Sequence, residues 1–127
     1  MSDKKPPAEE RMALRTIAMP ADTNPSGDIF GGWLLAQMDL AGGAAAIKRT
    51  RGRVATVQVE AMTFHRSVHV GDLVSIHSDM LREGRSSMKV GVEAWVTRQP
   101  SGERFKVTEA VFTFVAIGED GKSRALP

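Results

Sequence analysis

Cysteine is absent from this chain of 127 residues. The absence excludes a disulfide framework, a thiolate nucleophile and the cysteine-rich zinc sites. It also agrees with a cytoplasmic location, which we expect. Histidine is scarce: the three histidines, His65, His69 and His77, lack the spacing of metal ligands. Ordinary surface or hydrogen-bonded side chains are the better interpretation, and we expect no metal and no cofactor.

An excess of charge of one sign is lacking as well. The chain has 17 basic and 15 acidic residues and a net charge of +2, with no run of five basic residues. Nucleic acid is therefore not an expected partner, although this balance allows a local basic patch for a phosphorylated ligand. The N-terminal sequence MSDKKPPAEER is not followed by the apolar core of a signal peptide. We interpret residues 1–12 as a flexible leader and residues 13–127 as a single domain.

The chain also has no long apolar run free of charge. Residues 29–47 have the length of a membrane span, but they contain Asp39 and four glycines. A carboxylate at the centre of a bilayer costs a few kcal/mol, about 3 by insertion scales. A buried helix in a globular domain is the better interpretation, and no membrane span is expected.

The remaining pattern predicts one helix and a set of strands. A helix is favoured from about Phe30 to Arg49, because the segment has no proline and no β-branched residue before Ile47. A short strand near Leu14 precedes it, with the turn ADTNPSGD between them. Alternating or continuous apolar residues predict four further strands, over residues 54–64, 73–81, 88–96 and 105–117.

One helix followed by four meandering antiparallel strands predicts an α+β domain whose sheet covers the helix. Residues 111–117 are apolar at both strand faces, as an interior strand would be. The helix is apolar almost all round, which indicates that protein encloses it on most sides. A single sheet leaves such a helix partly uncovered, so we expect a homodimer.

Asp39 is the only ionisable residue in the apolar segment of residues 29–47. On a helix it lies on nearly the same stripe as Gly32, with Gly42 and Gly43 one turn further. The pattern predicts a carboxylate in a groove floored by glycines, and carboxylates in such surroundings are enriched at active sites. The alternative is an aspartate that satisfies a backbone group or an arginine across a dimer interface.

Asn24 lies just before the predicted helix, where unpaired N–H groups and the helix dipole favour negative charge. An oxyanion could be held there by the N–H of Gly32 or its neighbour, with Asp39 two turns deeper as base or nucleophile. The alternative for Asn24 is a plain turn residue before Pro25.

The segment NPSGDIFGGWLLAQMD, residues 24–39, closely resembles the signature of hotdog-fold acyl-CoA thioesterases. The likeness is to the small bacterial YciA-like enzymes and to the two repeats of brain acyl-CoA hydrolase. Further segments resemble the family in the family's order, so that the likeness covers residues 14–126: RTIAMPADTN, GRVATVQVEAMTF, VGDLV, GRSSMKVGVEAWV and VTEAVFTFVAI.

The resemblance implies a hotdog fold, in which an antiparallel sheet wraps around one central helix and two chains pair into a continuous sheet. Three such dimers commonly form a hexamer. The implied reaction is hydrolysis of an acyl-CoA thioester to CoA and a fatty acid. In the family, the aspartate at the position of Asp39 is catalytic, and the asparagine at the position of Asn24 completes the site from the partner subunit. Gly32 matches a glycine whose N–H serves the oxyanion hole.

The CoA phosphates need basic and hydroxyl groups, which the GRSSMK turn offers. The candidates are Arg85, Ser86, Ser87 and Lys89. An exposed basic hairpin tip without a ligand is the alternative for this turn. For the whole chain, the alternative function is a non-catalytic acyl-CoA binding or sensor protein.

Overall fold

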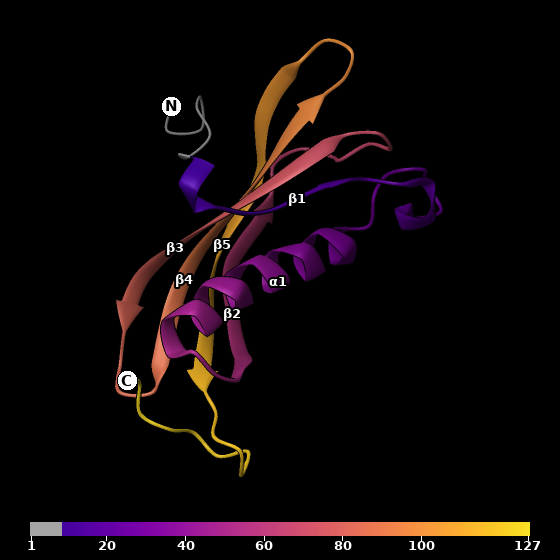
Figure 1. The fold of residues 1–127 in the computed structure, drawn as a ribbon. Helices are drawn as coiled ribbons and strands as arrows, with labels where there is room; N and C mark the ends of the chain where they lie inside the picture. Colours follow the sequence, from indigo (N-terminus) through magenta and orange to yellow (C-terminus); the bar gives the residue numbers. More distant parts are fainter. Residues whose placement is uncertain (1–8) are drawn as a thin grey trace.

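The computed structural model describes residues 9–127, which form an α-helix and a five-stranded sheet (Figure 1). Strand β1, Met12–Ile17, leads through a short 3₁₀ turn, Pro20–Asp22, to helix α1, Gly31–Thr50. The other strands are β2, Val54–Phe64; β3, Leu73–Glu83; β4, Ser87–Arg98; and β5, Glu103–Ala116. Each helix or strand predicted from the sequence is therefore confirmed, with boundaries shifted by a few residues at most.

The leader predicted over residues 1–12 lies mostly outside the described residues. Of its last four residues, Glu9–Arg11 form a 3₁₀ turn and Met12 begins β1. Residues 9–127 contain no helical segment that reaches the length and hydropathy of a bilayer span.

The strand order is β1-β3-β4-β5-β2, and every neighbouring pair is antiparallel. The predicted meander is right for β3, β4 and β5 but wrong for β2, which pairs with β5 at the far edge instead of with β3. The reason is visible in β5, whose residues are largely buried on both faces. Such a strand needs a neighbour on each side, whereas β2 has many exposed side chains and suits an edge. The interior position predicted for residues 111–117 is confirmed.

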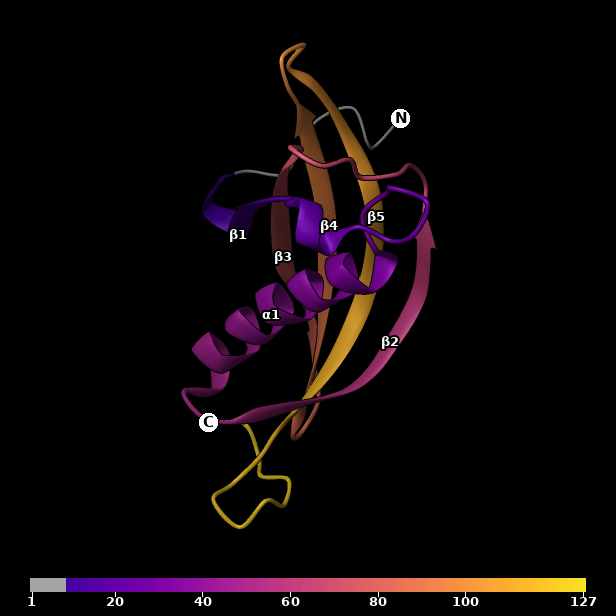
Figure 2. The ribbon, with the colours of Figure 1, turned by 90° about the vertical axis from the view of Figure 1, so that its right-hand side faces the viewer.

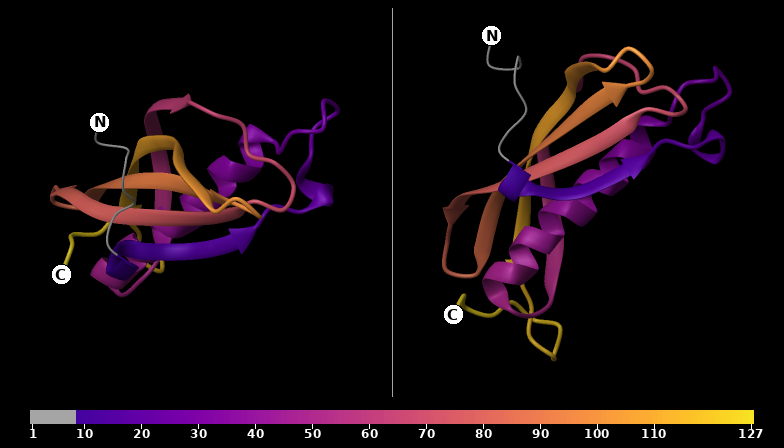
Figure 3. Two further views of the ribbon diagram at one scale, coloured as in Figure 1. Left: turned by 90° about the horizontal axis from the view of Figure 1, so that it is seen from above. Right: turned by 45° about the horizontal axis from the view of Figure 1, so that its top comes forward.

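Helix α1 packs one face against the concave side of the curved sheet (Figures 2 and 3). The buried face carries Leu34, Met38 and Ala46 at helical spacing. On the opposite face, Leu40 is 64% exposed and Ile47 is 50% exposed. The helix is thus not enclosed on most sides within one chain, because a single sheet reaches only one of its faces.

Gly42 allows a close approach of α1 to the sheet. A Cβ atom at Gly42 would lie 3.1 Å from the ring of Phe114 and 3.2 Å from Val92. Phe114 is buried and stacks on Phe112 at a centroid distance of 6.1 Å, so it has little room to move. Gly42 is therefore a packing residue facing the core. The prediction that it floors a groove beside Asp39 is wrong, because the position that a Cβ would take at Gly42 is filled by Phe114 and Val92 of the core and not by an open groove.

The neighbouring glycines give a matched test of this packing. Alanine at position 42 must push against Phe114, whereas a Cβ at Gly43 would lie at an ordinary contact distance of 3.7 Å. Both changes gain the same helix propensity, so their difference isolates the clash. We expect Gly42→Ala to have a free energy of unfolding about 1–3 kcal/mol below that of Gly43→Ala, measured by urea denaturation. Equal stabilities would show that the contact between α1 and β5 relaxes freely.

Candidate active site

Asp39 lies in the middle of α1 and is partly exposed on the side that faces β2. The hydroxyl of Thr56, on β2, donates a hydrogen bond of 2.7 Å to Asp39 Oδ1. This contact fixes the orientation of the carboxylate and occupies only one of its oxygens. The carboxylate is thus held by a neutral donor, and no arginine of residues 9–127 pairs with it.

Thr56 was not among the residues that the sequence singled out. It alternates with apolar residues along β2, as polar residues of any half-buried strand do. Its contact with Asp39 joins two elements that are 17 residues apart in the sequence. The contact of Thr56 with Asp39 can be identified only from the structure, in which β2 passes beside α1.

Asn24 organises the turn before α1. Its Oδ1 accepts hydrogen bonds from the N–H of Ser26, at 2.9 Å, and from that of Asp28, at 3.2 Å. The turn role considered for this residue is therefore present in the structure. Its side-chain amide N–H groups make no hydrogen bond within residues 9–127, and Asn24 lines a cavity of about 350 Å³ at the N-terminal end of α1.

Gly31 and Gly32 begin α1 and present backbone N–H groups at its positive end. The first N–H groups of a helix have no partner within it, and these two make none of the loop hydrogen bonds of residues 9–127. Gly32 is exposed, and a Cβ atom there would meet nothing within 4 Å. Packing within one chain therefore does not require glycine at position 32, and the N–H groups are open to a ligand.

One chain does not bring Asn24 and Asp39 together. Asp39 is eight residues beyond Gly31, or about 12 Å along the helix axis, whereas Asn24 precedes the helix.

Strand β2 is an edge strand, and its exposed residues include Val57, at 57%, and Val59, at 38%. An unpaired apolar edge of this kind is a template for pairing with another strand.

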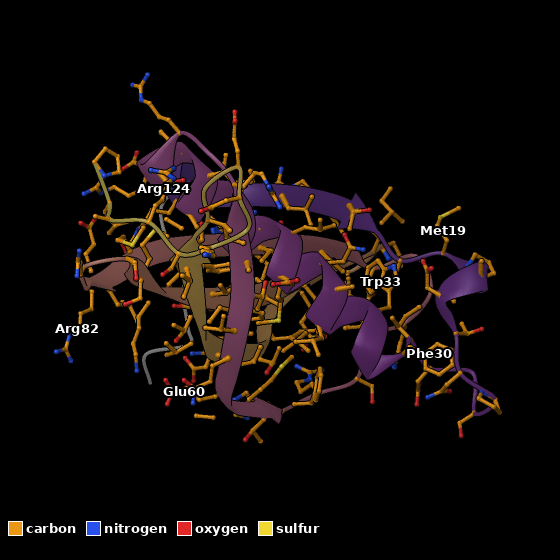
Figure 4. All side chains as sticks on the ribbon, turned by 90° about the horizontal axis from the view of Figure 1, so that it is seen from below. Met19, Phe30, Trp33, Glu60, Arg82 and Arg124 are labelled. Atoms are coloured by element: carbon orange, nitrogen blue, oxygen red, sulfur yellow. The ribbon has the colours of Figure 1, made fainter. Side chains whose placement is uncertain are left out.

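The two ends of the molecule differ in chemistry (Figure 4). Met19, Phe30 and Trp33 gather near the N-terminal end of α1, whereas Arg82 and Arg124 lie toward the opposite end. Met19 and Phe30 are about half exposed. The apolar end therefore lies beside the cavity that Asn24 lines, and the basic end lies away from it.

The four candidate CoA residues are not clustered around one point. Arg85 is exposed in the turn between β3 and β4, whereas Lys89 lies within β4 and forms an ion pair of 3.1 Å with Glu60. The turn lies near the C-terminal end of α1, because Arg49 and Glu83 form an ion pair of 2.7 Å there. Arg49 follows Asp39 by ten residues, so the turn lies about 15 Å from the carboxylate along the helix.

A buried ion pair holds the loop between β2 and β3, residues 65–72, which forms one wall of the cavity. Asp72 accepts hydrogen bonds from Arg98 at 2.8 and 3.0 Å and from the N–H of His69 at 2.8 Å. Burial pushes the pKa of Asp72 upward, but these donors together hold it below its ordinary value. Arg98 also donates to the carbonyl of Ser67, which joins the loop to β4.

Within residues 9–127, no three histidine or carboxylate side chains converge as metal ligands.

Comparison with known proteins gives a consistent result. A family described as the thioesterase superfamily matches residues 26–102. The acyl-CoA thioester hydrolase YciA of Escherichia coli is 50% identical over 119 residues, which are 91% of this chain and 90% of that protein.

Solved structures agree with the same relationship. The hexameric thioesterase y2039 from Yersinia pestis is 49% identical with a TM-score of 0.88, over 92% of this chain and 96% of that one. Cj0915, a hexameric hotdog fold thioesterase of Campylobacter jejuni, is 38% identical with a TM-score of 0.87, over 92% and 90% of the two chains. The predicted hotdog fold is therefore confirmed.

Proposed function

Because this chain belongs to the thioesterase superfamily, we propose that it hydrolyses acyl-CoA thioesters to CoA and free fatty acids. The observation that carries this proposal is the near full-length similarity to an acyl-CoA thioester hydrolase, at 50% identity. We place the activity in one hotdog domain over residues 13–127 and, given the absence of cysteine, in the cytoplasm.

Asp39 is the reacting carboxylate in this proposal. As a general base, it takes a proton from a water molecule whose oxygen attacks the thioester carbonyl carbon. As a nucleophile, it attacks that carbon itself and forms a mixed anhydride that water then hydrolyses. In both routes the C–S bond breaks and the CoA thiolate leaves and takes up a proton. Thr56 positions the carboxylate through its hydrogen bond of 2.7 Å to Oδ1.

The N-terminal end of α1 stabilises the negative charge that develops on the thioester oxygen. The N–H of Gly32 is the proposed donor, since nothing in the chain crowds it. A preorganised N–H donor of this kind contributes about 3 kcal/mol in other acyl-transfer enzymes. Glycine at this position leaves room for the thioester to approach the backbone.

The site is completed by a second chain. We propose that two β2 edges pair, which forms a continuous sheet and covers Val57 and Val59. Asn24 of the partner subunit then orients the water or the carbonyl beside Asp39 with its free amide N–H groups. Three such dimers form a hexamer in this proposal, and the relatives y2039 and Cj0915 are hexameric.

The phosphates of CoA are assigned to the turn between β3 and β4. Arg85 offers an exposed guanidinium, and Ser86, Ser87 and Lys89 add hydroxyl and ammonium donors. The distance of about 15 Å along α1 from this turn to Asp39 leaves room for an extended pantetheine arm. This assignment requires that Lys89 exchange its contact with Glu60 for a phosphate.

The activity is tested by measuring the release of free thiol from acyl-CoAs of short, medium and long chain length. We expect saturable turnover with at least one of them. No release with any chain length would overturn the proposed hydrolysis. Saturable binding of the same acyl-CoAs without release would then identify a binding protein instead.

A further inference from the structure

Three ionisable side chains form a row on the sheet face turned away from α1. His77 on β3 is directly opposite Glu93 on β4, which is directly opposite Glu109 on β5. Val92 points toward α1, where it would meet a side chain at Gly42. Because successive strand residues point to opposite faces, Glu93 points away from the helix. The proposed hydrolysis uses none of the three.

The row lines a cavity of about 400 Å³, which is within the size range of small-molecule sites. Asp79 and Arg11 lie at its polar end, beside the row. Leu81 and Val111 give it an apolar wall, next to Gly91. The cavity therefore combines several charges with a surface suited to an aliphatic group.

His77 has unused hydrogen-bonding capacity inside this cavity. The residue is only 5% exposed, yet neither ring nitrogen has a hydrogen-bond partner within residues 9–127. Burial lowers the pKa of His77, and the nearby Arg11 and Arg15 add to this effect against the opposing influence of Glu93. The ring is therefore neutral at pH 7 and offers one donor and one acceptor. Buried polar groups without a partner are rare in folded proteins.

The carboxylates of the row each keep one oxygen without a protein donor. Glu93 Oε1 accepts from the indole N–H of Trp95 at 2.9 Å, and Glu109 Oε1 accepts from Lys106 at 2.9 Å. Among residues 9–127, their Oε2 atoms accept no hydrogen bond. Like charges directly opposite on neighbouring strands repel each other, and a cation between them would remove the repulsion.

The cavity walls carry an excess of negative charge. Asp79, Glu93 and Glu109 line it together with Arg11, and Lys106 pairs with Glu109 at 2.9 Å, which leaves one net negative charge among these five side chains. Arg11 is already paired with Asp79, at 3.2 Å. A metal ion does not match this arrangement, since no three ligands of residues 9–127 converge. An organic cation is larger, and its carbon chain can use the apolar wall.

We propose that this cavity binds a small organic cation, a primary alkylamine. Its ammonium group lies between the free oxygens of Glu93 and Glu109, and the acceptor nitrogen of His77 takes a third N–H. Its alkyl chain lies against Leu81 and Val111. Because the site is on the far face of the sheet from Asp39, it is separate from the proposed hydrolysis.

Titration calorimetry of the full chain with pentylamine tests this proposal without any acyl-CoA. Wild type should bind it saturably at millimolar concentration or below, and pentan-1-ol should not bind. Glu93→Gln keeps the acceptor for Trp95 but loses the charge, and should weaken binding about tenfold or more. Glu109→Gln should do the same and serves as a second variant, because Glu109 is half exposed and tolerates substitution.

Glu103→Gln is the matched control, since Glu103 is also on β5 but pairs with Arg66 outside the cavity. It should bind pentylamine as wild type does. Absence of saturable binding by wild type, equal binding of pentan-1-ol, or equal binding by both cavity variants would each overturn the proposal. If wild type binds no amine and Glu93→Gln changes the assembly in light scattering, a neighbouring copy fills the cavity instead.

Discussion

Replacement of Asp39 by alanine is expected to lower kcat for acyl-CoA hydrolysis about a thousandfold while the protein stays folded. The change removes the only carboxylate of α1, and with it the base or nucleophile in either proposed route. Stability should fall by less than about 1 kcal/mol, since both Asp39 and its partner Thr56 have access to water. Thiol release measures kcat, and urea denaturation measures stability.

Two further variants separate the charge of Asp39 from its position. Asp39→Asn keeps the acceptor for Thr56 but has no negative charge, so it should be almost as inactive as alanine. Thr56→Ser keeps the hydroxyl, so it should retain most of the activity that Thr56→Val loses, with the loss in kcat more than in KM. A folded Asp39→Ala protein with wild-type kcat would refute the proposed role of this residue.

The contribution of Asn24 from the partner subunit is tested by mixing two variants that each lose activity. Asn24→Ala and Asp39→Ala chains are each expected to be inactive alone. In mixed dimers, one of the two shared sites would combine the intact Asn24 of one chain with the intact Asp39 of the other. Mixing should therefore restore activity. No recovery in dimers that are shown to be mixed would contradict the proposal that one site takes Asp39 from one chain and Asn24 from the other.

The elements of the fold could be predicted from the sequence because each has a local signal. Helix α1 has a proline-free segment of good helix formers, and β4 alternates buried with less buried residues over most of its length. The position of β2 had no such signal. Its alternation predicts a strand but not which neighbour it has, and pairing with β5 instead of β3 depends on contacts that are distant in the sequence.

In the candidate site, too, only residues with a local signal in the sequence could be predicted. Asp39 could be identified because a single charge interrupts an apolar segment, and Asn24 because it lies before a helix. Thr56 could not, since its role depends on a contact across 17 residues. Gly42 and Gly43 are a similar case, because neighbours in the sequence have different surroundings in the fold. A Cβ would press on Phe114 at 3.1 Å from position 42 but lie at an ordinary contact distance of 3.7 Å from position 43, although composition makes the two residues equivalent.

The largest expected loss of stability is at Asp72, which lies far from Asp39 in the sequence. Asp72 is 2% exposed and satisfies both the guanidinium of Arg98 and the N–H of His69. Its own N–H and carbonyl join the loop to His69 and to Ala18 after β1. The carboxylate of Asp72 therefore ties β4 to the loop of residues 65–72, and its backbone carbonyl ties the same loop to Ala18.

Asp72→Ala should lower the free energy of unfolding by about 3 kcal/mol, because it leaves the partly buried guanidinium of Arg98 without its counter-charge. Asp79→Ala is the matched control. It removes the carboxylate from an aspartate–arginine pair of 3.2 Å that is about half exposed on both sides, and should cost less than about 1 kcal/mol. Equal losses in the two variants would show that Arg98 recovers its hydrogen bonds from water.

The pH dependence of the Asp72 variant has a definite sign. The pKa of Asp72 is lowered in the folded protein, so its carboxylate contributes stability above the pKa of an unfolded aspartate, about 3.9. That contribution is lost as the pH falls through the lower, folded pKa. The difference between wild type and Asp72→Ala should therefore be constant from neutral pH to about pH 5 and shrink in more acidic solution. Urea denaturation across this range measures it. A difference that grows toward acid would mean that the protonated form of Asp72 is the one the fold stabilises, contrary to its contacts with Arg98 and His69.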